Sequence, residues 1–249
     1  EYCIPAFVAT GESTINLNDI SCDIELKKRL KGVIAVSTKC KDESISLSLC
    51  TEEDVEVFPN AIDSKIFFLQ NKINCRNKLN ISLDKFVIAY VGYFNERKGS
   101  KRVSKVLDRF NDVYSIFIGS GNDRPDCKNQ LYTGPLPHRE ISKYLNAADV
   151  FVLPTLHEGC CNAIIEAMAC GLPIISSNKS FNWDILDESN SLLIDPLNEN
   201  EIFEAIKTLK VNKNQRMKLS QGALNKAKSL RIEERAKNIL CFMEQKINE

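Results

Sequence analysis

Short, continuously apolar runs alternate with longer segments of helical periodicity along almost the whole 249-residue chain. The apolar runs lie at 5–10, 32–37, 55–59, 86–92, 114–119, 149–154, 172–177 and 191–195. The periodicity predicts helices near 22–31, 39–49, 98–110, 138–147, 162–170, 199–210, 213–228 and 231–247. Strands that are apolar throughout are buried on both faces, which is typical of parallel sheets covered by helices. The sequence therefore predicts an α/β fold.

A polar segment rich in Asn and Lys, 69–85, interrupts this pattern and predicts a linker between two α/β units. The unit before it, 1–68, contains only three predicted strands and opens on Glu1 rather than Met, so we expect the first half of this domain to be missing. The unit after it, 86–230, has enough elements to stand alone. The last segment, 231–249, is predicted as a helix that crosses back to the first domain.

Composition and charge exclude several classes of protein. The 33 basic and 33 acidic residues give zero net charge, so no global field favours nucleic acid. No apolar run approaches the roughly 20 residues that cross a bilayer, and no signal peptide opens the chain. The ten cysteines form no C-x-x-C pair, and only His138 and His157 accompany them. We therefore expect reduced, structural thiols in a cytoplasmic protein, with no metal and no cofactor.

A basic cluster follows the predicted strand that ends at Gly92. It crowds the predicted first turn of the next helix and consists of Arg97, Lys98, Lys101 and Arg102. The positive end of the helix dipole disfavours cations there, so their presence indicates a bound anion. The alternative is a solvated basic helix start.

Two further loops are predicted at the same edge of the sheet. The turn "FIGSGNDRP" (117–125) follows a strand, and ligands of open α/β sheets bind outside the carboxyl ends of strands. Its glycines are equally consistent with a tight turn that needs positive φ. Pro137 or His138 opens the helix after the short strand near 131, and His138 is either a catalytic base or a solvent-facing residue.

The stretch "HEGCCNAIIEAMACGLPII" (157–175) places a carboxylate inside an apolar helix. With Asn162 as N-cap and Gly171 near the stop, Glu166 falls one turn inside the helix, surrounded by apolar residues. An unpaired buried carboxylate costs about several kcal/mol, so Glu166 needs hydrogen-bond donors. The hydroxyls of a vicinal diol, a backbone group or an arginine would supply them.

A second carboxylate, Glu158, stands in the loop just before this helix. The neighbouring backbone amides form a predicted rim for an anion or for oxygen atoms, and they belong to Gly159, Cys160 and Cys161.

The same stretch resembles the E-x7-E signature of the large retaining glycosyltransferase family that includes glycogen synthase and bacterial mannosyl- and glucosyltransferases. Supporting motifs occur in the order of the family: "VSTKCKDE", "VFPNAIDSKIF", "VGYFNERKG", "IGSG" and "TGPLPHREISKYLNAADVFVLPT". The resemblance covers nearly the whole chain. It implies two Rossmann-like domains facing across a cleft, the first only partly present here, with a nucleotide sugar bound mainly by the second.

The resemblance also implies roles for individual residues. Glu166 would accept the ribose hydroxyls of the donor, and Glu158 would face the transferred sugar. Lys98 and Arg97 would neutralise the departing diphosphate, and the backbone at Leu136 would contact the base. The remaining donor-site residues would be Gly92, Gly159, Cys160, Cys161 and Asn162.

Two departures from the family pattern occur. Tyr93 stands where an arginine often follows the first glycine of the phosphate loop, and Thr10 stands where a histidine often precedes Gly11. Gly11 and Glu12 are then the candidate cleft residues on the first domain, and activity of this chain alone is doubtful.

The prediction is therefore an enzyme: a retaining, metal-independent transferase that moves a hexose from a UDP- or GDP-linked donor to a glycan or lipid-linked acceptor of the cell surface. Peripheral association with the inner face of the membrane, through the missing N-terminal half, fits such an acceptor. The alternatives are a non-catalytic domain that binds nucleotide sugar and a sugar-nucleotide epimerase of similar architecture.

Overall fold

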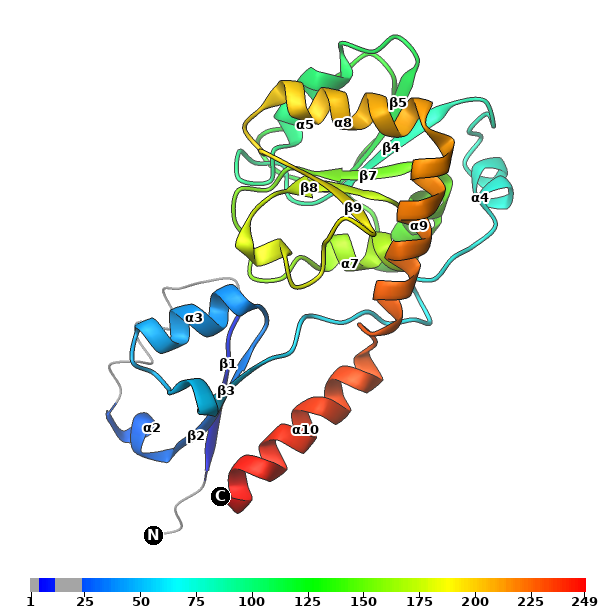
Figure 1. Ribbon diagram of the computed structural model, residues 1–249. Helices are drawn as coiled ribbons and strands as arrows, with labels where there is room; N and C mark the ends of the chain where they lie inside the picture. The colour runs from blue at the N-terminus through cyan, green and yellow to red at the C-terminus, as the bar shows by residue number, and fades with distance from the viewer. Residues whose placement is uncertain (1–4, 12–23) are drawn as a thin grey trace.

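The computed structural model describes residues 5–11 and 24–249, which form two α/β lobes (Figure 1). The first lobe holds a parallel sheet of three strands in the order β1-β2-β3. Its elements are β1 (Ala6–Ala9), α2 (Ile24–Arg29), β2 (Leu30–Ala35), α3 (Thr38–Ser46), the 3-10 helix η1 (Glu52–Asp54) and β3 (Val55–Val57).

The second lobe is built on a parallel sheet of six strands in the order β6-β5-β4-β7-β8-β9. The strands are β4 (Phe86–Val91), β5 (Val113–Ile118), β6 (Gln130–Gly134), β7 (Val150–Leu153), β8 (Ile174–Ser177) and β9 (Ser191–Ile194). Every residue of β7 and β8 is buried, so the continuously apolar runs are indeed covered on both faces. The predicted α/β fold is confirmed.

Helices cover this sheet on both sides (Figure 1). They are α5 (Ser100–Leu107), α6 (His138–Ala147), α7 (Asn162–Ala169), the 3-10 helix η2 (Ser180–Asn182), α8 (Glu199–Val211) and α9 (Lys213–Lys228). From β4 the chain moves outward through β5 and β6, then returns to β7 on the other side of β4. The carboxyl ends of β4 and β7 therefore flank the topological switch point, where open α/β sheets bind their ligands.

The polar segment 69–85 contains a helix, α4 (Lys72–Lys78), that packs against α6. The Asn71 side chain caps this helix by accepting a hydrogen bond from the amide of Asn74. Much of the segment expected to be a linker is thus part of the second lobe. The extended stretch before α4 makes the connection between the lobes (Figure 1).

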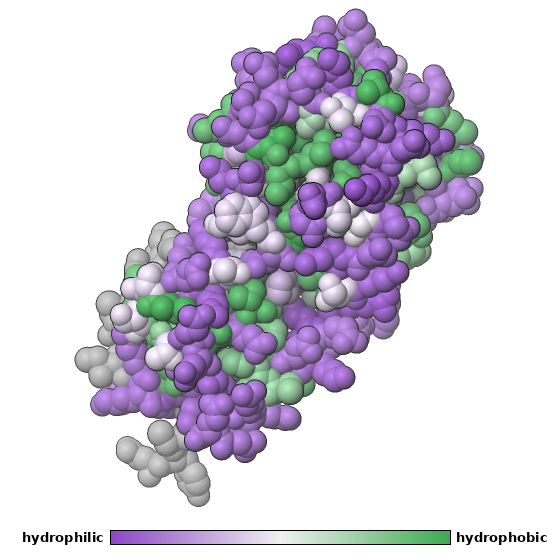
Figure 2. Space-filling model, viewed as in Figure 1, coloured by the Kyte–Doolittle hydropathy of each residue, from purple (hydrophilic) through white to green (hydrophobic). Residues whose placement is uncertain are grey.

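The last helix, α10 (Ile232–Asn248), leaves the second lobe and packs against β2 of the first. The ring of Phe242 lies 6.3 Å from that of Phe7 and 5.7 Å from that of Phe58, measured between centroids. Gly32 of β2 permits this approach, because a Cβ there would lie 2.9 Å from the Phe242 ring. In the same view the surface is mainly hydrophilic (Figure 2), and no helix of the described residues is long and apolar enough to span a membrane.

Candidate active site

A cavity of about 520 Å³ lies between the lobes at the switch point. It contains seven of the predicted site residues: Gly11, Gly92, Lys98, Glu158, Cys160, Cys161 and Asn162. Thr10, Val36 and Asn60 of the first lobe, Val91, Tyr93 and Ala163 of the second and Arg235 of α10 complete its wall. Arg97, Gly159, Leu136 and Glu166 lie outside this wall, and Glu12 lies outside the described residues.

Glu158 follows β7 and is 1% exposed. Its Oε1 accepts a hydrogen bond from Thr155 Oγ1 at 2.7 Å and forms an ion pair with Lys98 Nζ. The other oxygen, Oε2, lies 3.8 Å from Arg97 Nη1 and accepts no hydrogen bond from the described residues. The loops after β4 and β7 thus bring a buried carboxylate and a cation together across the switch point.

The four cations of the sequence cluster divide into two pairs. Helix α5 begins at Ser100, after Gly99 in the left-handed conformation (φ 77°), so Arg97 and Lys98 lie in the preceding loop and not in the first turn. Lys101 pairs with Asp123 at 2.9 Å, and Arg102 donates to backbone carbonyls at 2.8 and 2.9 Å. The prediction of one anion site was therefore wrong for Lys101 and Arg102, which brace the loops.

The glycine turn after β5 supports the loop that carries Lys98. A Cβ at Gly119 would lie 1.9 Å from the carbonyl oxygen of Gly92, and one at Gly121 would lie 2.3 Å from that of Phe94. Both glycines have positive φ. A tight turn with positive φ and close backbone contacts explains why both positions are glycine, without any contact to a ligand.

Glu166 has a partner that the sequence did not indicate. His138 Nε2 lies 2.8 Å from Glu166 Oε1, and the His138 ring packs edge-on against Phe67 with centroids 4.9 Å apart. Burial raises the pKa of the Glu166 carboxyl, and the hydrogen bond with His138 opposes that rise. His138 begins α6 and its side chain is 59% exposed, as the solvent-facing interpretation predicts, and its ring also contacts the Glu166 carboxyl group. It lies two positions beyond Leu136.

The start of α7 differs from the prediction by one residue. Cys161 occupies the N-cap with extended backbone, so Asn162 is the first helical residue and Glu166 the fifth. Asn162 is exposed at the cavity instead of capping the helix. The start of α7 therefore places Asn162 at the cleft.

The thiols of the paired cysteines are buried. Burial raises the pKa of Cys160 to about 12 and that of Cys161 to about 11, so neither thiol ionises near neutral pH. Asn60 Nδ2 donates to the carbonyl of Cys160 at 2.9 Å. The amides of 159–161 donate to no acceptor in the described residues. No three His, Cys, Asp or Glu side chains of the described chain gather as metal ligands.

Two further contacts join the first lobe to the second. At the start of α3, the Thr38 amide donates to Asp184 Oδ2 at 2.8 Å. Beside it, Lys39 Nζ lies 2.7 Å from His157 Nε2, next to Glu158. These contacts leave no local signal in the sequence, because each joins positions more than a hundred residues apart.

Two facing lobes with parallel sheets, and a buried carboxylate beside cations at the switch point, define a two-lobed α/β protein with a candidate site between its lobes. Comparison with known proteins narrows this class. The chain belongs to the family described as Glycosyl transferases group 1, which matches residues 71–226.

Similar proteins include the putative teichuronic acid biosynthesis glycosyltransferase TuaC of Bacillus subtilis, 31% identical over 70% of this chain and 45% of that protein. The O-antigen biosynthesis glycosyltransferase WclY of Escherichia coli is 26% identical over 65% of this chain and 47% of its own length. The chain thus spans about half the length of the curated relatives it matches.

Solved structures show the same fold. Anabaena Alr3699/HepE in complex with UDP-glucose superimposes with a TM-score of 0.82 at 17% identity, over 97% of this chain and 72% of that one. Sucrose-phosphate synthase from Thermosynechococcus elongatus superimposes with a TM-score of 0.78 at 20% identity, over 96% and 67%. The Rossmann-like character predicted for the lobes is confirmed by these neighbours.

Proposed function

We propose that the whole protein transfers a hexose from a nucleoside diphosphate sugar to a glycan or lipid-linked acceptor in cell-surface polysaccharide biosynthesis. The observation that carries this proposal is the buried Glu158, paired with Lys98 in a cleft at the switch point. Family membership supports transfer chemistry, and the names of the relatives concern teichuronic acid and O-antigen. A related fold holds UDP-glucose, which supports a nucleotide-sugar donor.

Glu166 is the proposed acceptor for the ribose hydroxyls. His138 occupies Oε1, whereas Oε2 accepts no hydrogen bond from the described residues. Two hydroxyl donors would satisfy a carboxylate that is otherwise buried with one partner. Leu136, in the connection that carries His138, is the proposed neighbour of the base.

The diphosphate is proposed to lie between the unbonded amides of 159–161 and the cations Lys98 and Arg97. Fixed amides and cations in a site shielded from water stabilise a leaving diphosphate without reorganisation at the moment of reaction. Glu158, next to this anion site, would then face the sugar. Retention of configuration and independence from divalent metal are parts of this proposal.

Calorimetry with UDP-glucose, UDP-N-acetylglucosamine and GDP-mannose tests the donor site on the chain as it stands. We expect one of these donors to bind in the presence of EDTA, and Glu166→Ala to weaken binding at least tenfold, because hydrogen bonds to a charged group contribute about 1.5–3 kcal/mol. Glu204→Ala, at an exposed position of α8, is the matched control. Failure of all three donors at millimolar concentration, or equal binding by Glu166→Ala, contradicts the proposal.

A further inference from the structure

The charges of this neutral chain are strongly segregated along the sequence. Residues 64–83 contain four cations and no Asp or Glu. Residues 205–232 contain eight cations and again no acidic residue. On an ordinary soluble surface, positive and negative side chains are interspersed, so two segments without any acidic residue are unusual.

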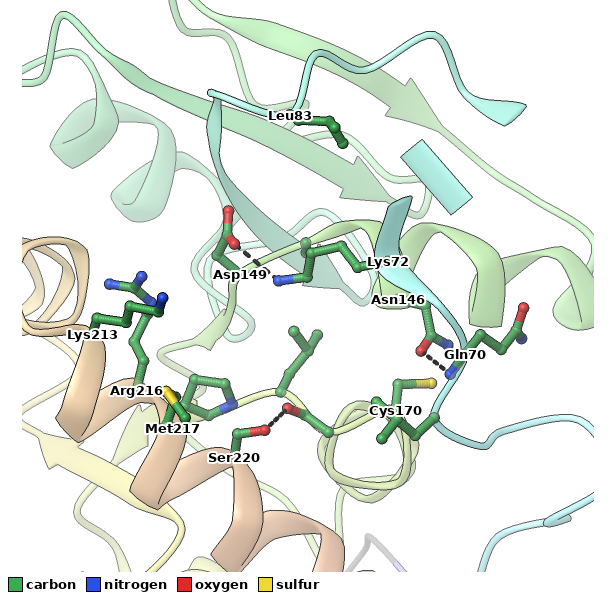
Figure 3. Close-up of a pocket in the computed structure, with 15 residues that line it drawn as sticks. Gln70, Lys72, Leu83, Asn146, Asp149, Cys170, Lys213, Arg216, Met217 and Ser220 are labelled. Atoms are coloured by element: carbon green, nitrogen blue, oxygen red, sulfur yellow. Dashed lines mark hydrogen bonds and ion pairs between the residues drawn. The ribbon is translucent and has the colours of Figure 1, made fainter. Parts of the chain in front are cut away.

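The two segments meet on one face of the second lobe, at the amino ends of the strands and away from the cleft. A hollow of about 520 Å³ there includes residues just before β7 and β8. Figure 3 shows Lys213, Arg216 and Met217 of α9 across the hollow from Lys72 and Leu83. A second hollow of about 210 Å³ shares Leu69 with the first and adds Phe68, Lys228 and Arg231. We call these two hollows the α4–α9 face.

Large apolar side chains on this face point into water. The exposed fractions are 58% for Leu69, 55% for Leu83, 60% for Met217 and 47% for Phe68. A patch that joins several such residues marks an interaction surface rather than an ordinary scatter of exposed side chains.

Most of the cations that line this face have no acidic partner among the described residues. Among the described residues, Asp149 is the one acidic residue that lines either hollow, and its carboxylate already binds Lys72 at 2.9 Å and Arg76 at 2.8 Å. No ion pair within the described residues engages Lys213, Lys228 or Arg231. The net field of the face is therefore positive.

The combination of aliphatic side chains and lysines fits an anionic bilayer better than nucleic acid. Single-stranded nucleic acid is bound through aromatic stacking platforms, whereas the hollow next to Lys213 presents leucine and methionine. Apolar side chains that enter the headgroup boundary, flanked by cations that approach lipid phosphates, are the features of interfacial membrane binding.

We propose that the α4–α9 face docks onto a leaflet of anionic phospholipid. Leu69, Leu83 and Met217 enter the boundary between headgroups and acyl chains. Lys213, Lys228 and Arg231 lie at the level of the phosphates. The inference rests on the surface alone and holds whether or not the cleft transfers a sugar, so vesicle binding and donor binding test the two proposals separately.

Cosedimentation of the chain with phosphatidylcholine vesicles, with and without phosphatidylglycerol, tests the docking. We expect binding only to the anionic vesicles, weakened by salt. Lys213→Glu lowers the partition coefficient at least about fivefold, the effect of one cation near an anionic surface. Leu83→Asp combined with Met217→Asp abolishes binding. Leu197→Asp and Lys237→Glu, at exposed positions outside the face, leave it unchanged.

A second measurement covers any variant that fails to fold. Met217→Trp should show a blue shift and quenching by brominated lipid on anionic vesicles, whereas Leu197→Trp should not. Absence of vesicle binding overturns the proposal. Binding that resists the Leu83 and Met217 changes indicates adventitious adsorption and also overturns it. Self-association without lipid that these same changes abolish would identify a protein interface instead.

Discussion

Replacing Arg76 by alanine should test how the segment between the lobes is anchored to the second lobe. The Arg76 side chain is 2% exposed. Nε donates to the carbonyl of Ala147 at 2.9 Å, and Nη1 donates to three carbonyls of the 82–85 turn at 2.9–3.3 Å. Nη2 binds Asp149 Oδ2 at 2.8 Å, and this oxygen also accepts the amide of Val87 at 2.7 Å. One guanidinium thus joins α4, the following turn and the starts of β4 and β7.

The expected loss follows from what Arg76→Ala leaves behind. Removing one partner of a buried ion pair costs about 3–5 kcal/mol, because the remaining charge stays desolvated. The Asp149 side chain is 15% exposed and retains Lys72, which places the expected loss near the lower end, at about 3 kcal/mol. Lys72→Ala removes the other cation from the same carboxylate, but Lys72 is 45% exposed, so it should cost only about 0–1 kcal/mol.

Urea unfolding followed by far-ultraviolet circular dichroism measures both losses. Arg76→Ala should lower the midpoint strongly with an unchanged slope, whereas Lys72→Ala should stay near the parent chain. Equal losses for the two variants, or a loss below about 1 kcal/mol for Arg76→Ala, would show that this buried network does not anchor α4.

Three other predictions concern single groups. Gly222→Ala should destabilise the chain by about 1–3 kcal/mol in thermal melts despite alanine's helix propensity, because its Cβ would lie 1.9 Å from a carbonyl oxygen. In native-state alkylation read by mass spectrometry, the exposed Cys241 should react, whereas the buried Cys160 and Cys161 should react only after unfolding. Because burial raises the pKa of Glu166, donor affinity should fall on acidification at a higher pH than an exposed glutamate would give, and Glu166→Gln should remove that dependence in calorimetry.

The sequence predicts the strands well because a strand that is buried on both faces appears as a continuous run of apolar residues. β7 reads "VFVL" with every residue buried, and no surface position interrupts it. The strand order β6-β5-β4-β7-β8-β9 cannot be recognised in the same way, because it depends on pairing between strands that are distant in the sequence. The location of the site, at the carboxyl edge of the sheet, is therefore predicted by the strand–loop motifs and the family resemblance, and periodicity does not predict it.

The features that the sequence did not predict correctly depend on tertiary contacts between distant residues. The seven-residue α4 has no clear apolar period, and the bonds of Arg76 and the cap at Asn71 hold it. Lys101 and Arg102 have the sequence pattern of anion ligands, but their partners, Asp123 and two backbone carbonyls, are brought to them by the fold.

The two carboxylates of 157–175 are held in different ways, and the difference bears on catalysis. Glu166 contacts His138, whereas Glu158 forms an ion pair with Lys98, the cation that is also the proposed partner of a phosphate. A buried oxygen without a donor costs about 1–3 kcal/mol, and Glu158 Oε2 is such an atom. A ligand that places a hydroxyl near Oε2 would donate the missing hydrogen bond, and an anion on the same ligand would bind Lys98. Under the proposed function, a donor hydroxyl would supply the hydrogen bond that Glu158 Oε2 lacks within the described residues.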